Sequence, residues 1–157
     1  IRNRYESHKP ILLKVSPDCS DDQIMEISDI ASRNGLDGIV ATNTTITRPE
    51  PSNTQSRIAF SQNGGVSGRP LQKRSLEVIS NLYEHSDGDM TIVGVGGIDS
   101  PDSAWKAITS GASLIQLYSA LVFNGPGVTS SIVRGLKKKV SENGFSGISE
   151  AIGYAHR

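Results

Sequence analysis

Two segments in the second half of the chain contain the residue types that bind a phosphate group. Val93-Gly94-Val95-Gly96-Gly97 places two adjacent glycines after an apolar run, where backbone N–H groups can approach an anion closely. The next apolar run ends in Tyr118 and Ser119, which add hydroxyl groups. We therefore predict a phosphate site formed by Gly96, Gly97, Tyr118 and Ser119. The alternative is that the two glycines only form a tight turn.

A lysine and a polar tetrapeptide mark two earlier apolar runs. Lys14 interrupts residues 11–15, where an unpaired ammonium group is unfavourable unless it meets water or an anion. It either points into a site that holds an anionic ligand or extends to solvent at a sheet edge. Thr42-Asn43-Thr44-Thr45 offers an amide and hydroxyls, which suit a planar hydrogen-bonding ligand or a local Asx or Ser/Thr turn.

A second glycine-rich stretch, Gly64-Gly65-Val66-Ser67-Gly68, also has two interpretations. It either brings backbone close to a ligand or forms an ordinary loop. The polar residues from Asn43 through Gly68 are many for a connection between two elements, and we therefore expect this stretch to be functional.

The apolar runs between these segments predict four strand–helix units. Strands are expected at residues 11–15, as a buried strand, and at 38–41, 90–95 and 114–118. Helices are expected after Ser20, which forms a capping box with Gln23, then at 71–83, at 101–109 after Ser100, and at 128–140. Each predicted strand is followed by polar or glycine residues at its carboxyl end.

Alternating strands and helices predict an α/β fold with a parallel sheet. Four units fit a small open doubly wound sheet or half of a (β/α)8 TIM barrel. A complete barrel needs about 250 residues, and the chain has 157. Because barrel enzymes keep their active sites at the carboxyl ends of the strands, the positions of the polar residues favour the half-barrel.

Composition excludes several kinds of partner and site. The chain has 16 Lys+Arg and 16 Asp+Glu, so it lacks the basic character of a protein that binds nucleic acid. Its apolar runs are far shorter than the ~20 residues of a membrane span. With Cys19 as the only cysteine, no intrachain disulfide is possible and we predict no metal site. For His85 and His156 we expect surface or packing roles.

The ordered motifs resemble the dihydroorotate dehydrogenase family. The similar segments are Ala41-Thr42-Asn43-Thr44-Thr45 with Arg48-Pro49, Gly64 through Leu71, Val93 through Ile98, Gln116 through Leu121, Gly125-Pro126, and Ala151-Ile152-Gly153 with His156-Arg157. Within the family the chain is most similar to class 2, the membrane-associated, quinone-reducing branch, through Lys14-Val15-Ser16-Pro17-Asp18 and its ending. Ser119, where the family more often has Thr, and Ser16, where it usually has Ala, are small departures.

The resemblance implies an FMN-containing TIM barrel of pyrimidine biosynthesis, of which residues 1–157 supply the C-terminal half. It implies cofactor contacts by Lys14, Thr42, Ser67, Gly68, Gly96, Gly97, Tyr118 and Ser119, the last four at the phosphate. It also implies that Asn43 and Thr44 hydrogen-bond dihydroorotate or orotate.

Other parts of such an enzyme are expected outside this chain. No catalytic residue is assigned here, because the resemblance places the catalytic serine base and the quinone-tunnel helices in an N-terminal half. We expect that half as partner, ubiquinone as electron acceptor, and an isolated chain that is inactive. The implied location is the mitochondrial inner membrane in a eukaryote, which the Ser- and Asn-rich residues 53–63 favour, or the cytoplasmic membrane in a bacterium. Membrane association would be peripheral, through residues outside the chain.

Two other functions stay open on the residues alone. One is another FMN- or phosphate-binding TIM barrel, similar to dihydropyrimidine dehydrogenase or IMP dehydrogenase. It would share Gly96-Gly97 but not Thr42-Asn43-Thr44-Thr45 with Arg48-Pro49. The other is a non-catalytic half-barrel that binds a phosphate ligand or a protein partner.

Overall fold

The strands form one parallel sheet in the computed structural model, which describes residues 9–157. They are β1 (Leu12–Val15), β2 (Gly38–Ala41), β3 (Ile92–Gly94) and β4 (Leu114–Ile115), and they lie side by side in chain order. Sequential order with parallel pairing means that every connection returns on the same side of the sheet. A doubly wound sheet instead reverses its strand order at a switch point. The winding is therefore that of a barrel, as predicted.

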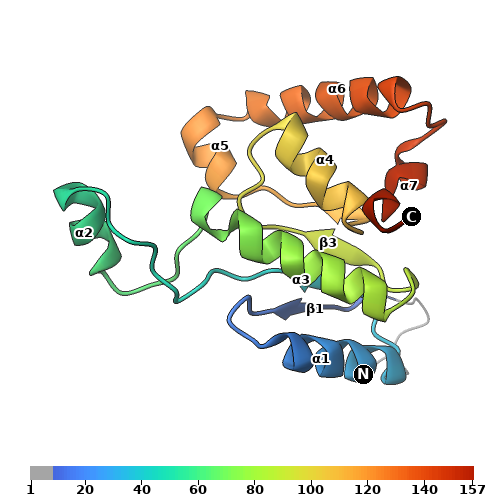
Figure 1. The fold of residues 1–157 in the computed structure, drawn as a ribbon, viewed down its shortest axis with the longest axis horizontal. Helices are drawn as coiled ribbons and strands as arrows, with labels where there is room; N and C mark the ends of the chain where they lie inside the picture. Colours follow the sequence, from blue (N-terminus) through green and yellow to red (C-terminus); the bar gives the residue numbers. More distant parts are fainter. Residues whose placement is uncertain (1–8) are drawn as a thin grey trace.

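Helices follow the strands and cover one face of the sheet. They are α1 (Asp21–Arg33), α2 (Thr54–Phe60), α3 (Gln72–His85), α4 (Pro101–Thr109), α5 (Ser119–Asn124), α6 (Gly127–Glu142) and α7 (Ile148–Ala151), with 3-10 turns at Arg69–Leu71 and Tyr154–His156. Helix α3 packs beside α1, and α6 packs on α4, whereas α2 stands away from the other helices (Figure 1).

Two predicted helix starts are confirmed. The Ser20 hydroxyl accepts a hydrogen bond from the Gln23 amide at 3.2 Å, and the Gln23 side chain accepts one from the Ser20 amide at 2.9 Å. Ser100 forms the equivalent capping box with Ser103, and Pro101 follows at the first helical position. These bonds satisfy N–H groups that have no partner inside the helix.

Two predictions about the elements are wrong in part, and helix α2 was not predicted. The polar stretch from 43 to 68 contains α2, which Asn53 caps through the Ser56 amide; a serine three residues after the cap is a weaker signal than Glu or Gln. The fourth strand is only Leu114–Ile115, because α5 begins four residues later. The first strand is not buried, since Ile11, Leu12 and Leu13 are 42%, 42% and 37% exposed at the sheet edge.

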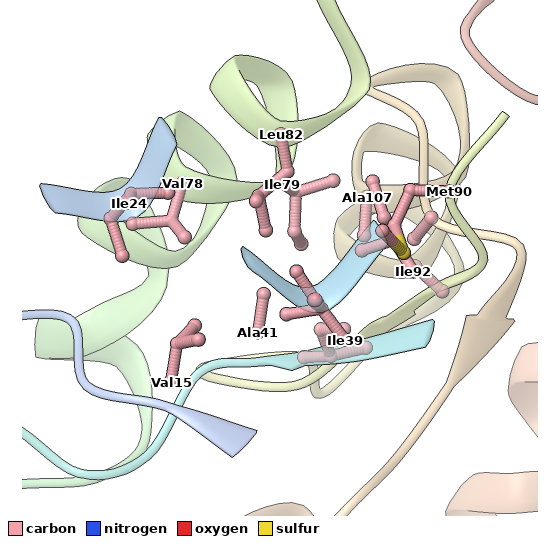
Figure 2. Packing of buried hydrophobic residues seen from close by; sticks show 14 of the residues in the cluster. Val15, Ile24, Ile39, Ala41, Val78, Ile79, Leu82, Met90, Ile92 and Ala107 are labelled. Carbon is pink, nitrogen blue, oxygen red and sulfur yellow. The ribbon is translucent and has the colours of Figure 1, made fainter. Parts of the chain in front are cut away.

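The hydrophobic core lies between the sheet and the helices. Ile39, Ala41 and Ile92 are fully buried and lie together with Val78 and Ile79 of α3 (Figure 2). Side chains alternate along a strand, so the residues between them belong to the opposite face. In register these are Lys14, Val40, Val93 and Leu114, one from each strand. The core therefore fixes which side chains face away from the helices.

Candidate functional site

One cavity brings together all the residues that the sequence analysis assigned to a site. It has a volume of about 550 Å³, within the range of roughly 300–1,000 Å³ that is usual for ligand pockets. Its lining includes Lys14, Thr42, Asn43, Thr44, Ser67, Gly68, Gly96, Gly97, Tyr118 and Ser119. Apart from Ser67 and Gly68, which follow α2, these residues lie on or shortly after the four strands, so the parallel sheet brings them together.

Lys14 lines this cavity even though it lies on an edge strand. Its neighbour Val15 is buried in the core, and alternation therefore directs Lys14 to the opposite face. Lys14 pairs in register with Val40, which pairs with Val93. The structure thus places Lys14 on the cavity side of the sheet, where it is exposed, and the binding of an anionic ligand there stays a prediction.

Gly96 and Gly97 have glycine-specific geometry because α3 approaches them closely. Their φ angles are +132° and +68°, which side chains rarely adopt. A Cβ on Gly96 would lie 2.8 Å from the Ser75 Cβ, and one on Gly97 would lie 2.6 Å from the Gln72 Cβ and 2.9 Å from the Gly68 carbonyl oxygen. Positive φ angles and close packing against α3 thus require glycine at both positions, and the same two residues also line the cavity.

Ser67, Gly68 and Ser119 come together opposite the glycine pair. The Ser119 hydroxyl donates a hydrogen bond to the Ser67 hydroxyl at 2.9 Å. Gly68 lies beside them, since a Cβ at this position would be 3.8 Å from the Ser119 Cβ. Backbone and hydroxyl groups from three separate segments therefore surround this end of the cavity, which is the donor chemistry that a phosphate requires.

Thr42, Asn43 and Thr44 continue β2 into the cavity. The amide of Thr42 donates to the Val95 carbonyl at 2.7 Å, and the amide of Asn43 donates to the Val15 carbonyl at 2.8 Å. Thr42 is buried, whereas Asn43 and Thr44 are exposed. Within residues 9–157, no hydrogen bond uses the side chain of Asn43 or Thr44. Both polar side chains are therefore available to a ligand.

The local turn that was the alternative for this tetrapeptide occurs at its last residue, Thr45. The Thr45 hydroxyl accepts a hydrogen bond from the Thr47 amide at 3.0 Å and donates to the Asp18 carboxylate. That carboxylate also accepts from the Ile46 amide at 3.0 Å. Partial burial raises the pKa of Asp18, but the bonds from Thr45 and Ile46 outweigh it and hold the pKa below its ordinary value. Asp18 thus joins the segment after β1 to the segment after β2.

The sequence analysis missed two charged residues of the cavity. Arg69 and Asp99 both line it and form an ion pair, with Arg69 Nε 2.7 Å from an Asp99 carboxylate oxygen. Each follows a glycine motif by one or two positions, which was the available signal. Conversely, Ser16, Pro17 and Asp18 follow a strand end but do not line the cavity.

The histidines have structural contacts, as expected. His156 lies 2.8 Å from Glu84 and stacks on Tyr83 with ring centroids 5.1 Å apart, and His85 lies 2.7 Å from Asp29. Among residues 9–157, no group of three or more His, Cys, Asp and Glu is arranged to hold a metal ion. None of the described helices has the length and apolar character required to cross a bilayer.

Comparison with known proteins gives a consistent result. A sequence model of the family described as dihydroorotate dehydrogenase matches residues 2–140. A dihydroorotate dehydrogenase (quinone) from Trichodesmium erythraeum is 43% identical over 156 residues, which are 97% of this chain and 41% of the relative. Another from Rhodospirillum rubrum is 43% identical over 148 residues, 94% of this chain and 40% of the relative.

Solved structures agree with the sequence comparison. Ligand-free DHODH from Eimeria tenella has a TM-score of 0.86 and 36% identity, covering 93% of this chain and 40% of that one. The same organism's DHODH in complex with ferulenol has a TM-score of 0.89 and 34% identity, covering 98% and 40%. The chain thus spans about two fifths of the length of the curated relatives that it matches.

Proposed function

The chain belongs to the dihydroorotate dehydrogenase family, and we propose that it forms the cofactor-binding part of an enzyme that oxidises dihydroorotate to orotate with a quinone as electron acceptor. The names of the bacterial relatives, dihydroorotate dehydrogenase (quinone), support the acceptor. Such an enzyme acts in pyrimidine biosynthesis. The observation that carries the proposal is the convergence of the residues carried over from the family motifs on one cavity.

The donor set of the cavity fits FMN, which we propose as the cofactor. Gly96 and Gly97 follow β3, and Tyr118 and Ser119 follow β4, whereas Lys14 lies on β1. Ser67 joins the first group through its hydrogen bond with Ser119. Strands are spaced by about 4.8 Å, so Lys14 is separated from the glycine end by roughly 10–14 Å across the sheet. An elongated ligand with a phosphate at one end and a flat ring at the other suits this layout. Thr42, which follows β2, lies between the two ends in this assignment.

When bound, FMN supplies the acceptor for the hydride that leaves C6 of dihydroorotate. We propose that the Lys14 ammonium stabilises negative charge that develops at the ring end of the cavity. Asn43 and Thr44, whose side chains are exposed and unbonded within residues 9–157, would bind the amide groups and carboxylate of the substrate. Their short side chains on a strand end give the substrate a fixed orientation.

The proton at C5 of dihydroorotate needs a base, and we assign none to this chain. The cavity serines, Ser67 and Ser119, are hydrogen-bonded to each other, and Asp99 is paired with Arg69. We propose that the base is supplied by the other part of the same barrel. The quinone site and a peripheral attachment to the membrane that contains the quinone are proposed to belong to that part as well.

A visible absorption spectrum of the native enzyme tests the proposal. A flavin band should be present, and anaerobic addition of dihydroorotate without an acceptor should bleach it. A flavin band that dihydroorotate does not bleach would favour a different flavin-dependent barrel, such as one similar to dihydropyrimidine dehydrogenase. Folded protein without flavin would refute the proposal and leave an IMP dehydrogenase-like phosphate barrel or a non-catalytic binding module.

A further inference from the structure

A long arm leaves the barrel beside the cavity and returns to the same point. Thr45 and Val66 form an antiparallel bridge, with N–H···O distances of 3.1 and 2.8 Å. We call residues 46–65, between these two, the arm. It contains α2, which has no buried residue and stands away from the other helices (Figure 1). Hydrophobic packing therefore does little to hold the arm in place.

One side chain, Arg48, closes the base of the arm. Its guanidinium donates to backbone carbonyl groups on both limbs. The acceptors are Thr45 (3.4 Å) and Ile46 (3.3 Å) on the outgoing limb, and Phe60 (3.1 Å), Gln62 (3.4 Å) and Gly64 on the returning limb. Among the described residues these carbonyls are its only partners, and no carboxylate pairs with it.

The two limbs that Arg48 joins both continue into the cavity. Directly before Thr45 on the outgoing limb are Asn43 and Thr44, and directly after Val66 on the returning limb is Ser67. The limbs also touch, because a Cβ on Gly65 would lie 2.0 Å from the Thr44 hydroxyl oxygen. A shift of the returning limb would therefore displace Thr44.

We propose that Arg48 is a positioning residue for the substrate end of the cavity. It acts through Thr45 and Gly64, holding the two limbs in register so that Asn43 and Thr44 face the ligand. The phosphate end depends on the packing of Gly96 and Gly97 against α3, which Arg48 does not contact, and Ser67 is held to that end by its own hydrogen bond with Ser119. Loss of Arg48 should therefore weaken binding of the planar ring ligand and leave the cofactor in place. The inference rests on the proposed function, since it takes orotate as that ligand.

The test compares Arg48→Gln with Arg57→Gln in the flavin-loaded enzyme. Arg57 lies exposed on α2 of the same arm, and its side chain has no hydrogen bond or ion pair within residues 9–157, so the control removes the same charge. Orotate affinity is measured by titration calorimetry, and flavin content by absorbance after release. For Arg48→Gln we expect the orotate Kd to rise by about tenfold or more with one flavin retained per chain. Arg57→Gln should change neither.

A conservative variant keeps the test decisive if Arg48→Gln does not fold. Arg48→Lys retains the charge but replaces a planar five-donor fork by a point donor that cannot reach both limbs, so it should also weaken orotate binding. Native orotate affinity in either folded variant would overturn the positioning role. Equal loss of flavin and orotate would do the same, because it would indicate general unfolding. Native enzyme that binds flavin but not orotate would instead refute the proposed function, before any variant is compared.

Discussion

At the scale of single residues, the site depends on a few positions where only one residue type fits. Gly97 is the clearest, because it combines a φ of +68° with an approach to Gln72 and Gly68 that leaves no room for a Cβ. Gly125 has nearly the same φ, +69°, but a Cβ there would meet nothing within 4 Å. The two glycines therefore separate the energetic effect of backbone conformation from that of crowding.

Replacing each by alanine should reveal this difference. Both positions have a positive φ, which costs about 1–3 kcal/mol for a residue with a Cβ. Gly97→Ala should in addition displace α3 from the phosphate end and reduce flavin affinity, whereas Gly125→Ala should retain it. Urea unfolding and flavin titration measure the two effects. Equal flavin affinity in both variants would mean that the crowding at Gly97 does not matter for the ligand.

Lys14 is the other residue whose type matters for chemistry. Because its neighbour Val15 faces the core, the alternation of side chains along β1 directs Lys14 toward the cavity. Lys14→Ala should slow flavin reduction by dihydroorotate by about tenfold or more, since loss of one electrostatic stabiliser typically has at least this effect. Stopped-flow reduction of the native and variant enzymes measures it. Lys73→Ala, on the exposed surface of α3, is the control for loss of charge, and a native rate in Lys14→Ala would remove Lys14 from the mechanism.

At the scale of elements, helices α3 and α2 have very different roles. Helix α3 carries fully buried side chains and supplies the wall behind the two glycines, whereas α2 buries none. Arg74 of α3 also donates to the carbonyls of Pro17 at 2.9 Å and Cys19 at 2.7 Å. Helix α3 therefore fixes both the phosphate end of the cavity and the segment that follows β1.

Substitution of one isoleucine in each helix tests the different roles of α3 and α2. Ile79 of α3 is 0% exposed and Ile58 of α2 is 59% exposed. Ile79→Ala should lower the free energy of unfolding by about 2–5 kcal/mol, because it leaves a cavity in the core. Ile58→Ala should change it by less than about 0.5 kcal/mol. Chemical denaturation measures both, and a large loss of stability in Ile58→Ala would show that α2 packs against something in solution.

At the scale of the whole molecule, the sheet of residues 9–157 ends in two edges. β1 pairs only with β2, and β4 only with β3. Apolar side chains on the two edge strands are exposed, with Leu12 at 42% and Leu114 at 58%. Unpaired edges with apolar neighbours promote association with other strands. In a closed barrel both edges would be paired.

The 157-residue chain, prepared alone, should therefore self-associate. Sedimentation velocity over a concentration series should show species larger than the monomer, and Leu12→Lys with Leu114→Lys should shift the distribution toward monomer. A monomer at all concentrations would contradict the expectation that these edges need a partner. The double variant in the complete enzyme should in turn impair folding, because both positions belong to the sheet face opposite the helices.

The sequence predicted the local features of this protein well. The four strand–helix units and the caps at Ser20 and Ser100 could be inferred because each depends on neighbours close in the chain. The residues that line the cavity came instead from their positions after predicted strands and from the family resemblance. The alternation of strands and helices then predicted a parallel sheet, in which the carboxyl ends of all the strands lie along the same edge. Family membership followed from ordered motifs, which need no three-dimensional information.

Tertiary structure alone decided the features that depend on distant segments. Whether Lys14 faced solvent or the cavity depended on which face of β1 the helices cover. The need for glycine at 97 arises from α3, and the pairing of Arg69 with Asp99 joins residues thirty positions apart. The role of Arg48 depends on two limbs that meet only after the arm has closed. Such contacts form between residues that are far apart in sequence, so no local pattern of residue types can specify them.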